Sequence, residues 1–304
     1  TCFSPYFLNF IFMMFYSILI KQMFLKKEFN TIYYIILLFF SFFVNQYFGF
    51  IGINPIDSFF SFNTGYDILN GRYPFKDYWT ITGPFIGLTQ ALIFKILDVS
   101  WSSYVFHASI FNSIITLTTF YTLKIFNLNK HYCFIYSLCV ALLAYPSIGT
   151  PYVDHHSTYL SVISIFCFIL ALKTNLSFYW LILPIVLGFS FLTKQAPTGH
   201  IFIIISILSL VYFIFHFNIK KLVYGILGSF ITIALFFFFI TYLEIPLINF
   251  VDQYILFPLS LGESRLEYLF PFEFQRVIMR FKLIHLSALI LIYILIKEIL
   301  NKVE

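Results

Sequence analysis

Long apolar runs separated by short charged segments constrain this chain more than any other feature of its sequence. A transmembrane helix needs about 20 consecutive apolar residues, and several runs approach that length. The composition, 61% hydrophobic and 10% charged residues over 304 positions, excludes most soluble folds. We therefore predict an all-α, polytopic membrane protein with eight or nine transmembrane helices. The runs are 3–20, 31–53, 103–123, 131–145, 157–172, 177–193, 200–217, 222–243 and 283–297.

The distribution of basic residues predicts the orientation of these helices. One set of loops carries a net charge of +7 and the rest of the chain −2, which together give the +5 of the whole sequence. Because cytoplasmic loops are enriched in Lys and Arg, we place the basic set in the cytoplasm. The chain is then one transmembrane domain, 1–304, in which residues 1–30 add an N-terminal helix and a cytoplasmic loop. Three outer loops follow, at 54–84, 146–157 and 244–282. The basic set comprises 21–30, 124–130, 173–176, 218–221 and the C-terminal tail.

The first outer loop combines acidic and basic side chains with helix-boundary residues. Pro55 and Asp57 predict the start of a short amphipathic helix, and Asn70-Gly71 predicts its end. Asp57 then has two interpretations, a helix cap or a functional carboxylate. For the other acids of this loop, Asp67 and Asp77, the structural interpretation is a solvated loop face.

The second outer loop contains the stretch GTPYVDHHST, residues 149–158. Ionisable residues near membrane depth are functional by default. Asp154 is accordingly interpreted as a catalytic residue or, more simply, as the cap of the next helix. His155 and His156 would lie in the first turn of that helix, where the helix dipole disfavours the imidazolium. Asp154 and His156 are candidate ligands of a divalent cation, although Asp-His-His is a short metal motif.

Lys194 and the arginines complete the predicted outer surface. Lys194 lies between two apolar runs, where Pro197 and Gly199 predict a break in the helix. It is interpreted either as a lysine that marks the membrane interface or as a ligand of an anionic lipid headgroup. The four arginines all fall in outer segments, by chance or because a guanidinium binds phosphate in bidentate fashion. They are Arg72, Arg265, Arg276 and Arg280, of which the last two would share a helix face.

Three motifs in this order resemble a known family. The stretch GRYPFKDY covers residues 71–78, Gly83-Pro84 opens the next apolar run, and Thr193-Lys194 follows a later one. From about residue 31 to 217 the chain resembles the polyprenyl-phosphate-sugar-dependent glycosyltransferases of the GT-C superfamily. This superfamily includes protein O-mannosyltransferases, lipid A aminoarabinose transferases and oligosaccharyltransferases.

The resemblance implies an enzyme whose site lies in the outer loops. Asp57 would be catalytic, Asp154 would line the same site, and the Asp-His-His segment would help to bind Mg²⁺ or Mn²⁺. The donor would be a sugar on a polyprenyl phosphate, and the acceptor a lipid, glycan or protein. We expect Arg72, Lys76, Asp77, His155, Lys194, Arg276 and Arg280 to contribute to substrate binding. The expected location is the plasma membrane of a bacterium with the site on the extracytoplasmic face, and no nucleic acid is expected as a partner.

The residue types present suit inverting sugar transfer. The sequence is also compatible with other classes of membrane protein. Asp57 would act as the base in an inverting displacement, while Lys194, the outer arginines or a cation would stabilise the leaving phosphate. A transporter or lipid flippase also keeps ionisable residues among its helices, commonly with inverted repeats. A polymerase or ligase of surface polysaccharide is a second competing class, and a purely structural membrane subunit is a third.

Overall fold

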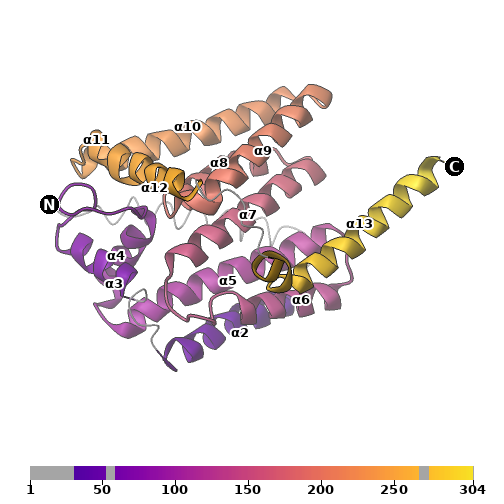
Figure 1. Ribbon diagram of the computed structural model, residues 1–304. Helices are drawn as coiled ribbons and strands as arrows, with labels where there is room; N and C mark the ends of the chain where they lie inside the picture. The colour runs from indigo at the N-terminus through magenta and orange to yellow at the C-terminus, as the bar shows by residue number, and fades with distance from the viewer. Residues whose placement is uncertain (1–30, 53–58, 267–273, 304) are drawn as a thin grey trace. The chain divides into compact units, whose positions relative to one another are not determined.

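The chain folds into helices. The computed structural model describes residues 31–52, 59–266 and 274–303, and its regular structure in these ranges is helical, apart from an isolated bridge between Pro74 and Tyr78 (Figure 1). The all-α prediction is thus confirmed for the described part. The predicted helix 3–20 and the loop 21–30 lie outside the described residues. Two compact units are present, Thr1–Leu256 and Phe257–Glu304.

The first unit contains most of the helices, and their boundaries follow the predicted apolar runs. α7 begins four residues before its predicted run and α9 five residues before its own, so that α9 starts directly after Lys194. The helices are α2 (Thr31–Gly49), α3 (Phe60–Leu69), α4 (Phe85–Leu97), α5 (Trp101–Ile125), α6 (Lys130–Leu143), α7 (Val153–Lys173), α8 (Phe178–Phe191), α9 (Gln195–Phe215), α10 (Ile219–Tyr242), α11 (Leu247–Phe250) and the π-helix η1 (Val251–Leu256). The second unit holds α12 (Phe257–Leu266), η2 (Gln275–Met279) and α13 (Lys282–Val303).

Among the described residues, four helices are long and apolar enough to cross a membrane. These are α2, α7, α9 and α10. The shorter apolar helices include α4, α6 and α8, whereas α5 has 25 residues but carries many polar side chains. These lengths and compositions identify a helical membrane protein.

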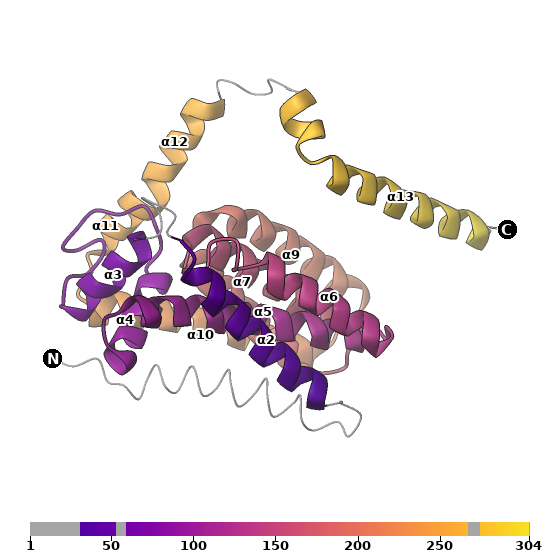
Figure 2. The same cartoon turned by 90° about the horizontal axis from the view of Figure 1, so that it is seen from below.

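The polar side chains of α5 face the interior of the bundle. α5 packs against α2 and α6 on one side and α7 on the other, and α8 separates α7 from α10 (Figures 1 and 2). Asn112 is fully buried on α5, and its amide donates to the backbone carbonyls of Ser41 on α2 (2.8 Å) and Ala141 on α6 (3.0 Å). Hydrogen bonds between helices contribute to their association in lipid, where the hydrophobic effect does not drive helices together. The buried polar residues of α5 therefore hold this part of the bundle together.

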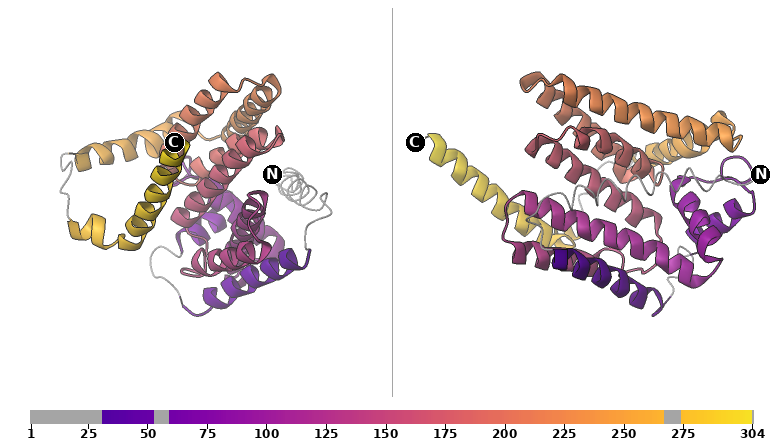
Figure 3. Two further views of the ribbon diagram at one scale, coloured as in Figure 1. Left: turned by 90° about the vertical axis from the view of Figure 1, so that its right-hand side faces the viewer. Right: turned by 180° about the vertical axis from the view of Figure 1, so that it is seen from behind.

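In the described part of the first unit, the acidic residues lie toward one of the two ends of the bundle, whereas lysines lie at both ends. We call one the acidic end; it includes Asp67, Asp77, Asp98, Asp154, Glu244 and Asp252. The opposite, lysine end contains the C-termini of α5 and α7 and the start of α10, with Lys124, Lys130, Lys173, Lys220 and Lys221. Figure 3 shows the helices running between these ends. The described parts of the predicted outer loops that belong to the first unit thus gather at one end.

Gly149 packs against Gly49, the last residue of α2, at the acidic end. Gly149 has φ of +75°, and a Cβ built there would lie 2.5 Å from the Cα of Gly49. The carbonyl of Gly149 also accepts a hydrogen bond from Asn45 (3.3 Å). A side chain at residue 149 is therefore excluded both by its backbone conformation and by its neighbour.

We predict that Gly149→Ala destabilises the protein by at least about 1–2 kcal/mol, the cost of a left-handed L-residue, with the contact to Gly49 adding to it. The measurement is reversible unfolding in mixed SDS micelles. Gly199→Ala is the control, because a Cβ there meets nothing within 4 Å and residue 199 lies in α9. Equal stability of the two variants would contradict the importance of this contact.

Candidate functional site

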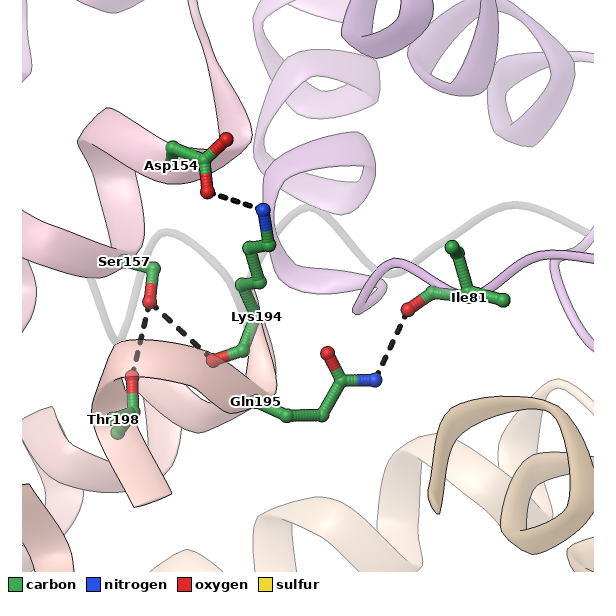
Figure 4. A network of polar contacts seen from close by, with 6 residues as sticks. All are labelled: Ile81, Asp154, Ser157, Lys194, Gln195 and Thr198. Carbon is green, nitrogen blue, oxygen red and sulfur yellow. Dashed lines mark hydrogen bonds and ion pairs between the residues drawn. The ribbon is translucent and has the colours of Figure 1, made fainter. Parts of the chain in front are cut away.

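An ion pair between Asp154 and Lys194 marks the centre of the acidic end. Asp154 lies in the first turn of α7, and Lys194 is the residue immediately before α9 (Figure 4). The Lys194 ammonium donates to Oδ1 of Asp154. Both side chains are partly exposed, 36% for Lys194 and 45% for Asp154. Two residues 40 positions apart in the chain thus form one charged, partly exposed site.

The structure corrects the capping interpretation of Asp154. Tyr152, with extended backbone, is the N-cap of α7, and no side chain caps this helix. Asp154 is instead a helical residue of the first turn. A carboxylate at this place interacts favourably with the helix dipole, and its hydrogen-bonding partner is a lysine from another helix.

A buried hydroxyl cluster fixes the helices that carry this pair. It consists of Ser157 and Ser161 on α7, Ser190 on α8 and Thr198 on α9, each at most 1% exposed. The hydroxyl oxygens of Ser190 and Thr198 lie 2.7 Å apart, and those of Ser157 and Thr198 3.0 Å apart. Ser157 also donates to the carbonyl of Lys194 (3.3 Å), as Figure 4 shows. The position of Lys194 relative to α7 is therefore set by hydrogen bonds deep in the bundle.

The end of the first outer loop packs directly beside Lys194. The amides of Gly83 and Phe85 donate to the carbonyls of Thr193 (3.0 Å) and Leu192 (3.1 Å). The side chain of Gln195 donates to the carbonyl of Ile81 (3.1 Å) (Figure 4). A Cβ at Gly83 would lie 1.9 Å from the carbonyl oxygen of Leu192, so this approach requires glycine. The Gly-Pro motif and the Thr-Lys motif are thus in contact.

Asp57 lies outside the described residues, but the segments on both sides of it belong to the acidic end. The ring of Phe59 lies 5.8 Å from that of Trp101, whose indole donates to the carbonyl of Gly49 (2.9 Å). Phe62 contacts Tyr104, and the Tyr104 hydroxyl donates to the carbonyl of Pro151 (3.0 Å). The chain therefore leaves α2 and enters α3 near the residues that precede Asp154.

The other charged residues predicted in the first loop have partners within or near that loop. Arg72 pairs with Asp67 (3.3 Å), and Lys76 pairs with Glu244 (3.0 Å). Asp77 accepts a hydrogen bond from the backbone amide of Tyr73 (2.6 Å). These contacts stabilise the loop and connect it to the segment after α10. A role of Arg72, Lys76 and Asp77 in substrate binding stays a prediction.

Tyr78, at the end of GRYPFKDY, is half-buried, and its hydroxyl group is buried. Burial raises the pKa of the Tyr78 phenol, and the nearby carboxylate of Asp67 adds to the increase. The phenol is therefore neutral at physiological pH. It contributes a polar but uncharged group to the loop that carries GRYPFKDY.

His156 points away from Asp154, into a buried hydrogen-bonded chain. Its Nε2 lies 3.2 Å from Nε2 of His107 on α5, and its Nδ1 lies 2.7 Å from the hydroxyl of Tyr145. Nδ1 of His107 in turn lies 2.8 Å from Oε1 of Gln90 on α4. Both histidines are fully buried. The chain of contacts ties the first turn of α7 to α5 and α4.

Asp154 and His156, the candidate metal ligands, are thus engaged by different protein groups. Among the residues that the structure describes, no group of three or more His, Cys, Asp or Glu side chains could hold a metal ion. A divalent cation at Asp154 and His156 stays a prediction.

His155 and the two arginines of the last outer loop complete the predicted set. The His155 ring lies 5.6 to 5.8 Å from the rings of Tyr152, Tyr159 and Tyr145. Arg276 lies in η2 and Arg280 directly follows it. Both belong to the second unit, so their predicted contribution to the site also stays a prediction.

The sequence alone did not single out His107 or the hydroxyl cluster. One signal was present, because α5 carries His107, Ser109, Asn112, Ser113 and Thr116 at helical spacing within an apolar run. Such a stripe indicates a face turned to other helices. It does not say which hydroxyl meets which, since that depends on helices far apart in the chain.

Comparison with known protein families, curated proteins and solved structures finds no match for this chain. The functional proposal therefore depends on the residues themselves and on the motifs that they form.

Proposed function

We propose that the protein is an inverting glycosyltransferase of the GT-C type. It would move a sugar from a polyprenyl phosphate to a lipid, glycan or protein acceptor at the acidic end. The observation that carries this proposal is the ion pair of Asp154 and Lys194 beside the docked first outer loop. An acidic residue and a cation in one accessible site are what a displacement at a sugar phosphate requires.

The charge distribution supports an extracytoplasmic site in a plasma membrane. Five lysines lie at the opposite end of the bundle, which is typical of the cytoplasmic side of a membrane protein. In this proposal eight or nine helices cross the bilayer, and α3 and α4 lie at its outer interface. The prenyl tail of the donor would lie among apolar side chains while its phosphate reaches the acidic end.

The proposed reaction assigns one role to each charged residue. Asp57 takes the proton of the acceptor hydroxyl as the acceptor oxygen bonds to the anomeric carbon. The bond from this carbon to the phosphate oxygen breaks, and the electron pair leaves with the lipid phosphate. Lys194 stabilises the negative charge that develops on this phosphate. Asp154 lines the same site and pairs with Lys194 before the donor binds.

We predict that Asp57→Asn lowers sugar transfer from a purified lipid-linked donor about 10²- to 10⁴-fold, the usual contribution of a general base. Asp154→Asn is expected to lower the transfer rate as well. The assay uses the full-length chain in lipid nanodiscs. Full activity in both variants would rule out this assignment.

Asp98→Asn is the matched control for these two variants. Asp98 is an exposed acid at the same end, and Asn has nearly the same size and shape as the Asp side chain that this backbone already accommodates. The substitution removes the same charge and should leave the transfer rate unchanged. A comparable loss in this variant would indicate a general electrostatic effect of the acidic end.

Chelation tests whether a cation takes part. Because Lys194 occupies Asp154 and two neighbouring side chains occupy His156, we expect transfer to retain most of its rate in EDTA. The measurement is the initial rate before and after dialysis against EDTA. A loss that Mg²⁺ or Mn²⁺ restores would instead establish the predicted cation site.

A further inference from the structure

The ammonium of Lys194 is held by one exchangeable partner on a rigid backbone. The Lys194 amide donates to the carbonyl of Ser190 (3.1 Å), and the Lys194 carbonyl accepts from Ser157 (3.3 Å). In the described part of the chain, Asp154 is the acceptor that the structure gives to its ammonium. Only the side chain is therefore free to change partner.

A second lysine pair at the same end has a different construction. Lys76 pairs with Glu244 and also donates to the carbonyl of Leu243 (3.3 Å). It therefore joins two segments that are 167 residues apart. The contact of Lys194 with Asp154 adds little by comparison, because the hydroxyl cluster already fixes α7 against α9. A partly exposed pair of this kind contributes little to stability and is readily exchanged.

We propose that the pair of Asp154 and Lys194 is an anion lock. In the resting protein Asp154 compensates the charge of Lys194; when a polyprenyl phosphate arrives, the Lys194 ammonium turns from the carboxylate to the phosphate. Asp154 is then released to face the acceptor. A phosphate competes well for the ammonium, since it offers several acceptor oxygens and a larger charge. The inference rests on the proposed function and specifies how its donor is recognised.

The anion lock and a cation bound at Asp154 predict opposite changes in phosphate-lipid affinity when the Asp154 carboxylate is removed. If Asp154 competes with phosphate for Lys194, removal of its carboxylate raises the affinity for a phosphate lipid. If Asp154 held a cation that binds phosphate, the same substitution would lower the affinity. One binding measurement therefore separates the two ways of recognising the donor.

The experiment measures binding of farnesyl monophosphate to the full-length chain in phosphatidylcholine nanodiscs. Asp154→Asn is expected to bind it about fivefold more tightly, the equivalent of one partly exposed ion pair. Lys194→Gln should bind it more weakly than the unsubstituted protein. In the double variant the gain from Asp154→Asn should vanish, whereas simple relief of charge repulsion would preserve it.

Glu244→Gln is the matched control, because it removes one carboxylate and one lysine ion pair at the same end. It should leave the affinity unchanged within about twofold, since Lys76 keeps its backbone acceptor. Farnesol tests the contribution of the tail alone, and inorganic phosphate and phosphatidylglycerol test other sources of the phosphate group. Equal gains with phosphatidylglycerol would show that the lock is not selective for the prenyl donor and would overturn it.

Weaker binding by Asp154→Asn, a gain that survives in the double variant, or an equal gain in Glu244→Gln would each overturn the lock. Sugar transfer by the unsubstituted protein is measured in parallel. Transfer without the affinity gain removes the lock and leaves the glycosyltransferase. The affinity gain without transfer leaves the lock and removes the glycosyltransferase.

Discussion

The hydroxyl cluster of Ser157, Ser161, Ser190 and Thr198 is the interaction on which the acidic end depends. Buried hydroxyl groups without partners would be costly in an apolar interior, and here they bond to one another across α7, α8 and α9. The carbonyl of Lys194 joins this network through Ser157. The backbone around the site is thus held by neutral hydroxyl groups. The charged side chains of Asp154 and Lys194 are not needed to hold it and can change partners.

The same principle organises the rest of the first unit, whose interior contains many polar side chains beside its apolar core and whose outer surface is apolar. Asn112 and the pair of His107 and His156 are fully buried, whereas Phe202 on α9 and Phe230 on α10 are more than half exposed. The hydrophobic effect does not drive helices together in lipid, so the specificity of their packing depends largely on hydrogen bonds and close glycine contacts. The contact of Gly49 with Gly149 and the contact of Gly83 with Leu192 are of the latter kind.

Several local features could be predicted because they depend on a few neighbouring residues. The short helix of the first loop ends at Asn70, followed by Gly71 with φ of +81°, as this dipeptide predicts. The predicted break beside Lys194 is present between Phe191 and Gln195, although Pro197 and Gly199, the residues that predicted it, lie within α9. The capping interpretation of Asp154 was wrong, since α7 extends one residue beyond it toward the N-terminus and a distant lysine takes its carboxylate.

The sequence by itself determined the all-helical class, most helix boundaries and the grouping of the described acids of the first unit at one end, because apolar periodicity and charge act over a few residues. Only the tertiary structure decided that Asp154 meets Lys194, that His156 meets His107, and that Gly83 lies against Leu192. These pairs join segments tens of residues apart or more. Their formation depends on the helix packing, which is set by hydrogen bonds and close contacts that no local pattern encodes.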